Sequence, residues 1–93
     1  MIKNKELYME FLIQNGVGKN DVVASSPKSY ISYLNGVSKL LNCEISEAII
    51  QNQIDIDNII NGLKGQRKKT TLQHYKTALN QYLKFLQHFK FLT

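Results

Sequence analysis

The sequence predicts an all-α fold, a compact bundle of about five helices that ends in one long C-terminal helix. Apolar residues recur every three or four positions in several segments, which is the spacing of a helix with one buried face. Glycine, proline and small polar residues, which often mark helix boundaries, separate these segments. We expect the 93 residues, 1–93, to form a single domain with one small core.

The first predicted helix covers about residues 3–15, with Phe11 on its apolar face. Gly16 is suited to the left-handed conformation that often ends a helix. The segment 17–26 is rich in glycine and small polar residues, so we expect a connecting loop there.

A second helix is predicted from Pro27, which suits a first helical position, to Leu41, with Ser26 as its cap. Gly36 within it costs about 1 kcal/mol relative to alanine, which indicates that another backbone packs closely at this point. The apolar face of this helix consists of Tyr30, Leu34, Val37 and Leu41.

Two short helices are predicted next, from Ser46 to about Gln51 and from Asp55 to Leu63, each capped by its first residue. Each contains an isoleucine pair that we expect on the buried side, Ile49–Ile50 and Ile59–Ile60. Cys43 is the only cysteine, so it cannot form an internal disulfide, and we expect it to be a small buried group.

The last helix has the clearest pattern. It is predicted to start at Thr70 or Thr71, either of which can cap it, and to continue for about 21 residues, or about 30 Å. Its apolar positions are Leu72, Tyr75, Leu79, Tyr82, Leu86 and Phe89. Tyrosines at this spacing are interpreted as core residues rather than as base-stacking groups. The predicted common core is Phe11, Leu34, Val37, Ile60, Leu79, Tyr82 and Leu86.

Charge is divided unevenly along the chain. Residues 1–63 carry five lysines against seven acidic residues, a net charge of −2, whereas residues 64–93 carry seven basic residues and no acidic one. An unbalanced basic segment is typical of a contact with nucleic acid or another anionic surface.

Four of these cations directly precede the long helix: Lys64, Arg67, Lys68 and Lys69. The start of a helix offers free backbone N–H groups and a partial positive charge, so a phosphate there would meet two kinds of donor. The predicted DNA-binding surface also includes Thr70, Thr71, His74, Lys76, Asn80 and Lys84. The partner that we expect is duplex DNA. The alternative interpretation is a solvated charged surface that keeps a small domain soluble.

The sequence has no recognisable catalytic constellation, so we expect a protein that is not an enzyme and that needs no cofactor or metal. His74 and His88 lie about 21 Å apart along one helix and cannot share a metal ion. Asp55 and Asp57 lack a further ligand, and helix capping accounts for Asp55. No apolar run approaches a membrane span and acidic residues interrupt the N-terminal segment, so we expect a cytoplasmic location.

The segment KKTTLQHYKTALNQYLKFL, residues 68–86, resembles the helical core-binding domain of tyrosine recombinases and phage integrases. The helical module beside the nuclease domain of some bacterial restriction endonucleases, including HNH types, offers a further resemblance. It pairs a first helix similar to SPKSYISYLNGVSKLL at 26–41 with a close similar to IDNIINGLKG…TLQHYKTALNQYLKFL at 56–86. The resemblance covers about two thirds of the chain. It implies a SAM-like DNA-binding accessory domain whose partner is a nuclease or recombinase catalytic domain. Recombinases need several catalytic arginines, and Arg67 is the only arginine here.

Two functions follow from these observations. The first is a non-catalytic DNA-binding module that holds duplex DNA for an active site elsewhere. The alternative is a protein-interaction domain that docks an acidic partner through the long C-terminal helix and the apolar segment HFKFLT at 88–93.

Overall fold

The computed structural model describes residues 1–14 and 27–91. Within these residues the protein contains four α-helices and no β-strand: α1 (Lys5–Gln14), α2 (Pro27–Leu41), α3 (Gln53–Leu63) and α4 (Lys69–His88). The all-α prediction is confirmed, and so are the limits of the second helix. The predictions for Gly16, for the segment 17–26 and for the cap at Ser26 lie outside the described residues.

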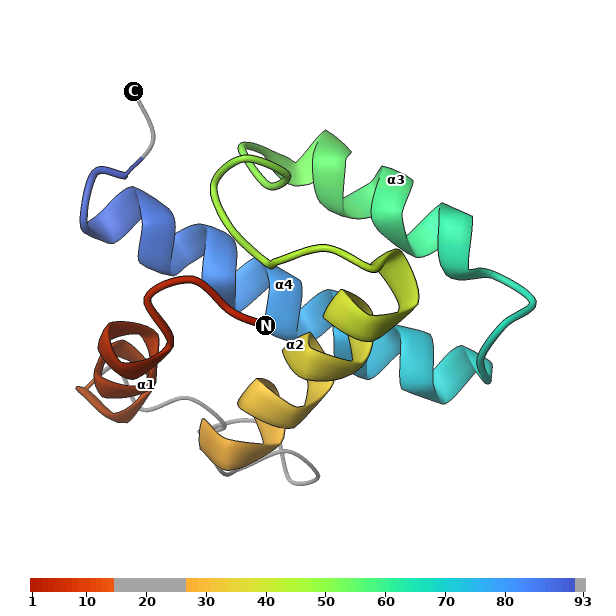
Figure 1. Ribbon diagram of the computed structural model, residues 1–93, viewed down its shortest axis with the longest axis horizontal. Coiled ribbons are helices and arrows are strands. Elements are labelled where there is room, and N and C mark those ends of the chain that lie inside the picture. The colour runs from red at the N-terminus through yellow and green to blue at the C-terminus, as the bar shows by residue number, and fades with distance from the viewer. Residues whose placement is uncertain (15–26, 92–93) are drawn as a thin grey trace.

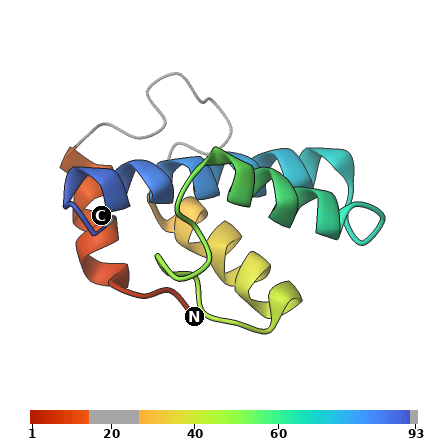
Figure 2. The same ribbon diagram turned by 90° about the horizontal axis from the view of Figure 1, so that it is seen from above.

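Helix α4 is the centre of the fold, because it contacts each of the other three helices. Figure 1 shows α1 near its C-terminal end, α2 crossing it, and α3 running beside it. In Figure 2 the same α3 and α4 again lie side by side, joined by a tight connection. The buried face of α4 comprises Leu72, Tyr75, Ala78, Leu79, Tyr82, Leu83, Phe85 and Leu86. Phe89, predicted at the end of this face, is 38% exposed because it follows the last helical residue.

The predicted core is confirmed except at α3. Phe11, Leu34, Val37, Leu79, Tyr82 and Leu86 are buried. Ile60 only packs against the edge of the core, as does Ile59, whereas Ile56 and Leu63 are buried. Ile56 and Leu63 are seven residues apart, or about two helical turns, so they share one face of the helix. Ile59 and Ile60 belong to the same face, three and four residues after Ile56, but they lie at its margin and are only partly buried.

The predicted short helix at 46–51 is wrong, because this segment forms only a single turn. The Ser46 hydroxyl accepts the Ala48 N–H at 3.2 Å, and the Ser46 carbonyl accepts the N–H groups of Ile49 and Ile50. The chain cannot continue as a helix, because Asn52 has the extended angles φ −158° and ψ 177°. Of the predicted pair, Ile50 is buried and Ile49 packs against the core.

Asn52 also corrects the predicted start of the next helix, because Asn52 rather than Asp55 is the N-cap of α3. Its side-chain oxygen accepts the Asp55 N–H at 3.0 Å. In return, the Asp55 carboxylate accepts the Gln51 N–H at 2.9 Å. This reciprocal arrangement satisfies backbone donors on both sides of the helix start, as in a capping box.

Lys3 and Asn4, predicted as the start of the first helix, form a turn instead, directly after a β-bridge between Ile2 and Ile45. The Lys3 N–H donates to the Ile45 carbonyl at 2.9 Å, and the Ile45 N–H donates to the Met1 carbonyl at 2.8 Å. Asn4 then takes a positive φ of 58°, and α1 begins at Lys5. Pairing with Ile45 satisfies backbone groups that a helical start would leave open.

Gly36 has the close neighbour that the sequence predicted, but that neighbour is a side chain rather than a backbone. A Cβ at Gly36 would lie 2.7 Å from the hydroxyl oxygen of Tyr75. The absence of a side chain therefore lets Tyr75 of α4 pack directly against α2. Cys43, in contrast, is exposed and is not the small core residue that we expected. It lies in the turn after α2, where the backbone rather than the side chain is held by Ser38.

Candidate nucleic-acid interface

A tight turn joins α3 to α4. Lys64 has φ −59° and ψ 135°, Gly65 has φ 89°, and the Gln66 N–H donates to the Leu63 carbonyl at 3.1 Å. These angles and this hydrogen bond define a type II β-turn, in which the third residue needs a positive φ and is usually glycine. The turn fixes the path of the chain into α4. We term residues 64–69 the basic turn.

The basic turn concentrates positive charge on the surface, at the end of the molecule opposite α1 (Figure 1). Its four cations are exposed: Lys64, Arg67, Lys68 and Lys69. None of the four forms an ion pair with an acidic residue in the described part of the chain. One guanidinium nitrogen of Arg67 donates to the Gln66 carbonyl at 2.7 Å, and its remaining N–H groups are left for an external acceptor.

The start of α4 differs from the prediction, because the helix begins at Lys69 and not at Thr70 or Thr71. Its N-cap is Lys68, which has an extended backbone and makes no side-chain capping bond. Thr70 and Thr71 thus lie inside the first turn, so their predicted capping role is wrong. The first helical hydrogen bond runs from the Leu72 N–H to the Lys68 carbonyl at 3.0 Å. The preceding N–H groups have no partner within the helix.

Lys76 is not part of the basic turn but lies on the side of α4 that faces α3, where it shares a pocket with Lys64. Its ammonium nitrogen is 3.6 Å from a carboxylate oxygen of Asp57, and both side chains are 48% exposed. The side-chain amide of Gln53 donates to the same oxygen at 3.4 Å. A pocket of about 340 Å³ lies here, lined by Asp57, Ile60, Asn61, Lys64 and Lys76. We term it the α3–α4 pocket.

His74 faces α2, away from the pocket beside α3. Its ring is stacked on Tyr33, with 5.1 Å between the ring centroids and 12° between the planes. The side chain is half-buried as a result. His74 therefore supports the contact between α2 and α4, and it is less open to a phosphate than the four cations of the basic turn.

Asn80 and Lys84 do not join the basic turn in one cluster. Lys84 is exposed, but it lies about 22 Å along α4 from Lys69. Asn80 is half-buried, and its side-chain oxygen is enclosed without a hydrogen-bond partner in the described residues. In this conformation that oxygen is not offered to a base edge.

The predicted core tyrosines, Tyr30, Tyr75 and Tyr82, are buried. Their rings therefore pack within the protein instead of forming a base-stacking platform. In residues 1–14 and 27–91, no group of three or more histidine, cysteine or acidic side chains is arranged to hold a metal ion. Among the same residues, no helix combines the length and apolar character that a membrane span requires.

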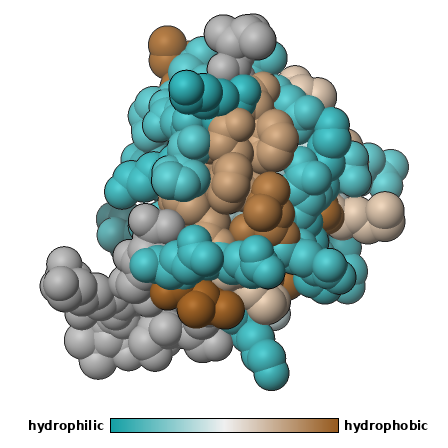
Figure 3. Space-filling view, turned by 90° about the vertical axis from the view of Figure 1, so that its left-hand side faces the viewer, coloured by the Kyte–Doolittle hydropathy of each residue, from teal (hydrophilic) through white to brown (hydrophobic). Residues whose placement is uncertain are grey.

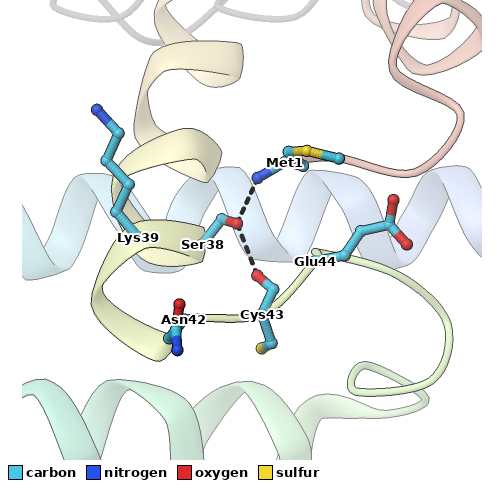
Figure 4. A pocket seen from close by; sticks show the side chains of 6 residues that line it. All are labelled: Met1, Ser38, Lys39, Asn42, Cys43 and Glu44. Carbon is cyan, nitrogen blue, oxygen red and sulfur yellow. Dashed lines mark hydrogen bonds between the residues drawn. The ribbon is translucent and has the colours of Figure 1, made fainter.

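A second pocket lies next to the N-terminus, and three of the residues that line it are joined by hydrogen bonds (Figure 4). The Met1 amino group donates to the Ser38 hydroxyl, which donates to the Cys43 carbonyl at 2.6 Å. Figure 4 also shows the side chains of Lys39 and Glu44 pointing away from this chain of bonds. These contacts fasten the N-terminal segment to the end of α2, so we assign them a structural role.

The sequence interpretation missed two residues of the α3–α4 pocket. Asp57 was considered only as a metal ligand, and Asn61 was not considered at all. Their signal was the spacing of Asp57, Asn61 and Lys64, which places three polar side chains within about two turns on one side of α3. Comparison with models of protein families, with curated proteins and with solved structures finds no match to this chain.

Proposed function

We propose that this chain is a non-catalytic DNA-binding module, in which the basic turn holds phosphates of duplex DNA. The observation that carries this proposal is the state of Lys64, Arg67, Lys68 and Lys69: all are exposed, and none is neutralised by a described acidic residue. Phosphate contacts dominate the affinity of most DNA-binding proteins, and a compact group of such cations suits that role.

The backbone at this point adds to the case. The type II turn fixes Lys64 and Gly65, so the cations are presented from a defined loop end and not from a long flexible arm. Arg67 retains free guanidinium N–H groups, and the exposed hydroxyl of Thr70 lies in the first turn of α4. A phosphate at the basic turn can therefore accept bonds from several kinds of donor.

The resemblance to accessory domains of restriction endonucleases and integrases supports a SAM-like module that works with a separate catalytic domain. In this proposal the chain positions DNA, while the nuclease or recombinase chemistry belongs to that partner in the bacterial cytoplasm. The all-α fold agrees with such a module at the level of fold class. Phosphate contacts position a protein on DNA without reading its sequence, so we expect modest sequence preference.

The test is a fluorescence titration of random duplex DNA at several salt concentrations. If each cation of the basic turn neutralises about one phosphate, the logarithm of affinity should fall with the logarithm of salt at a slope of about −3 to −4. The double variant Lys68→Ala/Lys69→Ala should flatten that slope by about 2 and weaken binding to all sequences alike.

The matched control is Lys5→Ala/Lys90→Ala, which also removes two exposed lysines, one at the start of α1 and one just after α4. Helix α1 and the C-terminal end of α4 lie at the end of the molecule opposite the basic turn (Figure 1). This control should leave the salt slope nearly unchanged. If the Lys68→Ala/Lys69→Ala variant binds DNA as tightly as the parent with the same slope, the basic turn is only a soluble connector.

A second candidate function, docking of an acidic protein partner, is favoured by the aromatic end of α4. Phe89 and Phe91 are 38% and 37% exposed, and Lys84 and Lys90 lie nearby in sequence and are exposed. Figure 3 shows apolar side chains between polar ones on this side of the molecule. If the variants of the basic turn bind DNA like the parent protein, docking of an acidic partner becomes the proposed function. Phe91→Ala should then abolish binding of that partner.

A further inference from the structure

The α3–α4 pocket is lined by one acidic and two basic side chains. Lys64 at the end of α3 and Lys76 on α4 both line it, together with Asp57 and the amide side chain of Asn61. The pocket adjoins the basic turn, because Lys64 belongs to both. Two lysines against a single carboxylate leave an excess of one positive charge, which suits an anion better than a metal ion.

We propose that this pocket binds one phosphate of the bound DNA. In the free protein the Asp57 carboxylate forms an ion pair with Lys76, in the place that the phosphate takes in the complex. The proposal rests on the proposed function, since the phosphate belongs to the same DNA that the basic turn holds. Lys64 and Lys76 would donate charged N–H groups to the phosphate oxygens, and the Asn61 amide would add a neutral donor.

The geometry of the ion pair supports displacement. The 3.6 Å between Lys76 and Asp57 is longer than the 2.7–2.9 Å of a strong charge-assisted hydrogen bond, and both side chains are half exposed. Such surface pairs contribute little stability and are weakened by salt. Lys76 can therefore exchange Asp57 for an incoming phosphate, while Gln53, bonded to Asp57 at 3.4 Å, keeps the carboxylate on the α3 side.

In this arrangement the Asp57 carboxylate lowers the affinity of the protein for DNA. The carboxylate offsets part of the charge of Lys76 in the free protein, and it repels a phosphate that binds beside it. Replacing Asp57 by asparagine keeps the shape of the side chain and removes its charge. Lys76 then becomes an additional unpaired cation next to the basic turn.

The experiment is a double-mutant cycle on the full chain with random duplex DNA as the probe, titrated at several salt concentrations. Asp57→Asn should tighten binding by about threefold to tenfold and steepen the salt slope by up to about 1. In the Lys76→Ala background the same substitution should give much less than this gain, since its target is absent. The control Glu10→Gln, which removes an exposed acid on α1, should have a far smaller effect.

Three results overturn the inference. Asp57→Asn can match the parent protein, Glu10→Gln can give an equal gain, or the gain can persist undiminished with Lys76→Ala. Any of these, in a parent protein that binds DNA through the basic turn, leaves the proposed function intact. A parent protein that binds no duplex DNA even at low salt overturns the proposed function and this inference together. Circular dichroism of each variant checks that the helical fold is retained.

Discussion

The Tyr82 hydroxyl donates a hydrogen bond of 2.8 Å to the backbone carbonyl oxygen of Lys3. The same hydroxyl lies 3.3 Å from the Ile45 carbonyl oxygen, so one side chain of α4 reaches both backbone segments of the N-terminal pairing. The Tyr82 ring is fully buried and meets Tyr8 edge to face, with 5.2 Å between centroids. This tyrosine therefore joins the core to a segment far from it in sequence.

Tyr82→Phe should lower the free energy of unfolding by about 1–2 kcal/mol, because the Lys3 carbonyl loses its donor while the ring stays in place. Chemical denaturation followed by circular dichroism measures this loss. Tyr33→Phe is the control, because Tyr33 is half-buried and its hydroxyl makes no hydrogen bond to a described residue. An equal loss in both variants would mean that the bond to Lys3 contributes nothing.

Two glycines near the end of α3 form a matched pair. A Cβ would meet no atom within 4 Å at either Gly62 or Gly65, but only Gly65 has a positive φ, 89°. Gly65→Ala should destabilise the protein by about 1–2 kcal/mol through backbone strain. Gly62→Ala should instead stabilise it by up to about 1 kcal/mol, because alanine favours a helix. Thermal unfolding of the two variants should shift in opposite directions, and shifts of the same sign would contradict the type II turn.

Leu79→Ala should cost about 2–5 kcal/mol, a large part of the stability of so small a domain. Leu79 is fully buried at the centre of the α4 face, so the substitution leaves a cavity. Ile54→Ala, at a position that is 68% exposed, should change stability by less than about 0.5 kcal/mol. Urea denaturation provides both values. A loss below about 1 kcal/mol for Leu79→Ala would place this side of α4 in solvent.

Alkaline pH should destabilise the protein. Burial raises the pKa of both Tyr8 and Tyr82 above the ordinary value of 10.0. Their contribution to stability is complete below pH 10.0 and is lost as the pH rises toward the folded-state values, because only the unfolded chain releases these protons readily. Thermal unfolding measured from pH 8 upward, with tyrosinate absorbance as the second signal, should show this decline. The Tyr82→Phe variant should show a shallower one; an equally steep decline would assign the effect to other groups.

The sequence alone determined, to within a few residues, the positions of the four helices in the described residues, and most of the core. The alternating spacing from Leu72 to Leu86 identified the buried face of α4, and Pro27 identified the start of α2. These features are local: a helix of many turns repeats its apolar signal, and proline restricts its own backbone. The basic turn was equally visible, because its four cations are consecutive or nearly so in the chain.

Only the tertiary structure decided which neighbour each helix face meets. Periodicity shows that one side of α3 is buried. Only the packing in the folded protein shows that Ile56 is fully buried, whereas Ile60 is partly buried. The segment 46–51 has apolar residues that suit either a helix or a turn. Ile45 pairs with the N-terminal backbone on one side and Asn52 is extended on the other, so only a single turn forms between them. Asp57 and Lys76 are far apart in sequence, so their ion pair, and the phosphate site that we propose beside it, follow only from the antiparallel packing of α3 on α4.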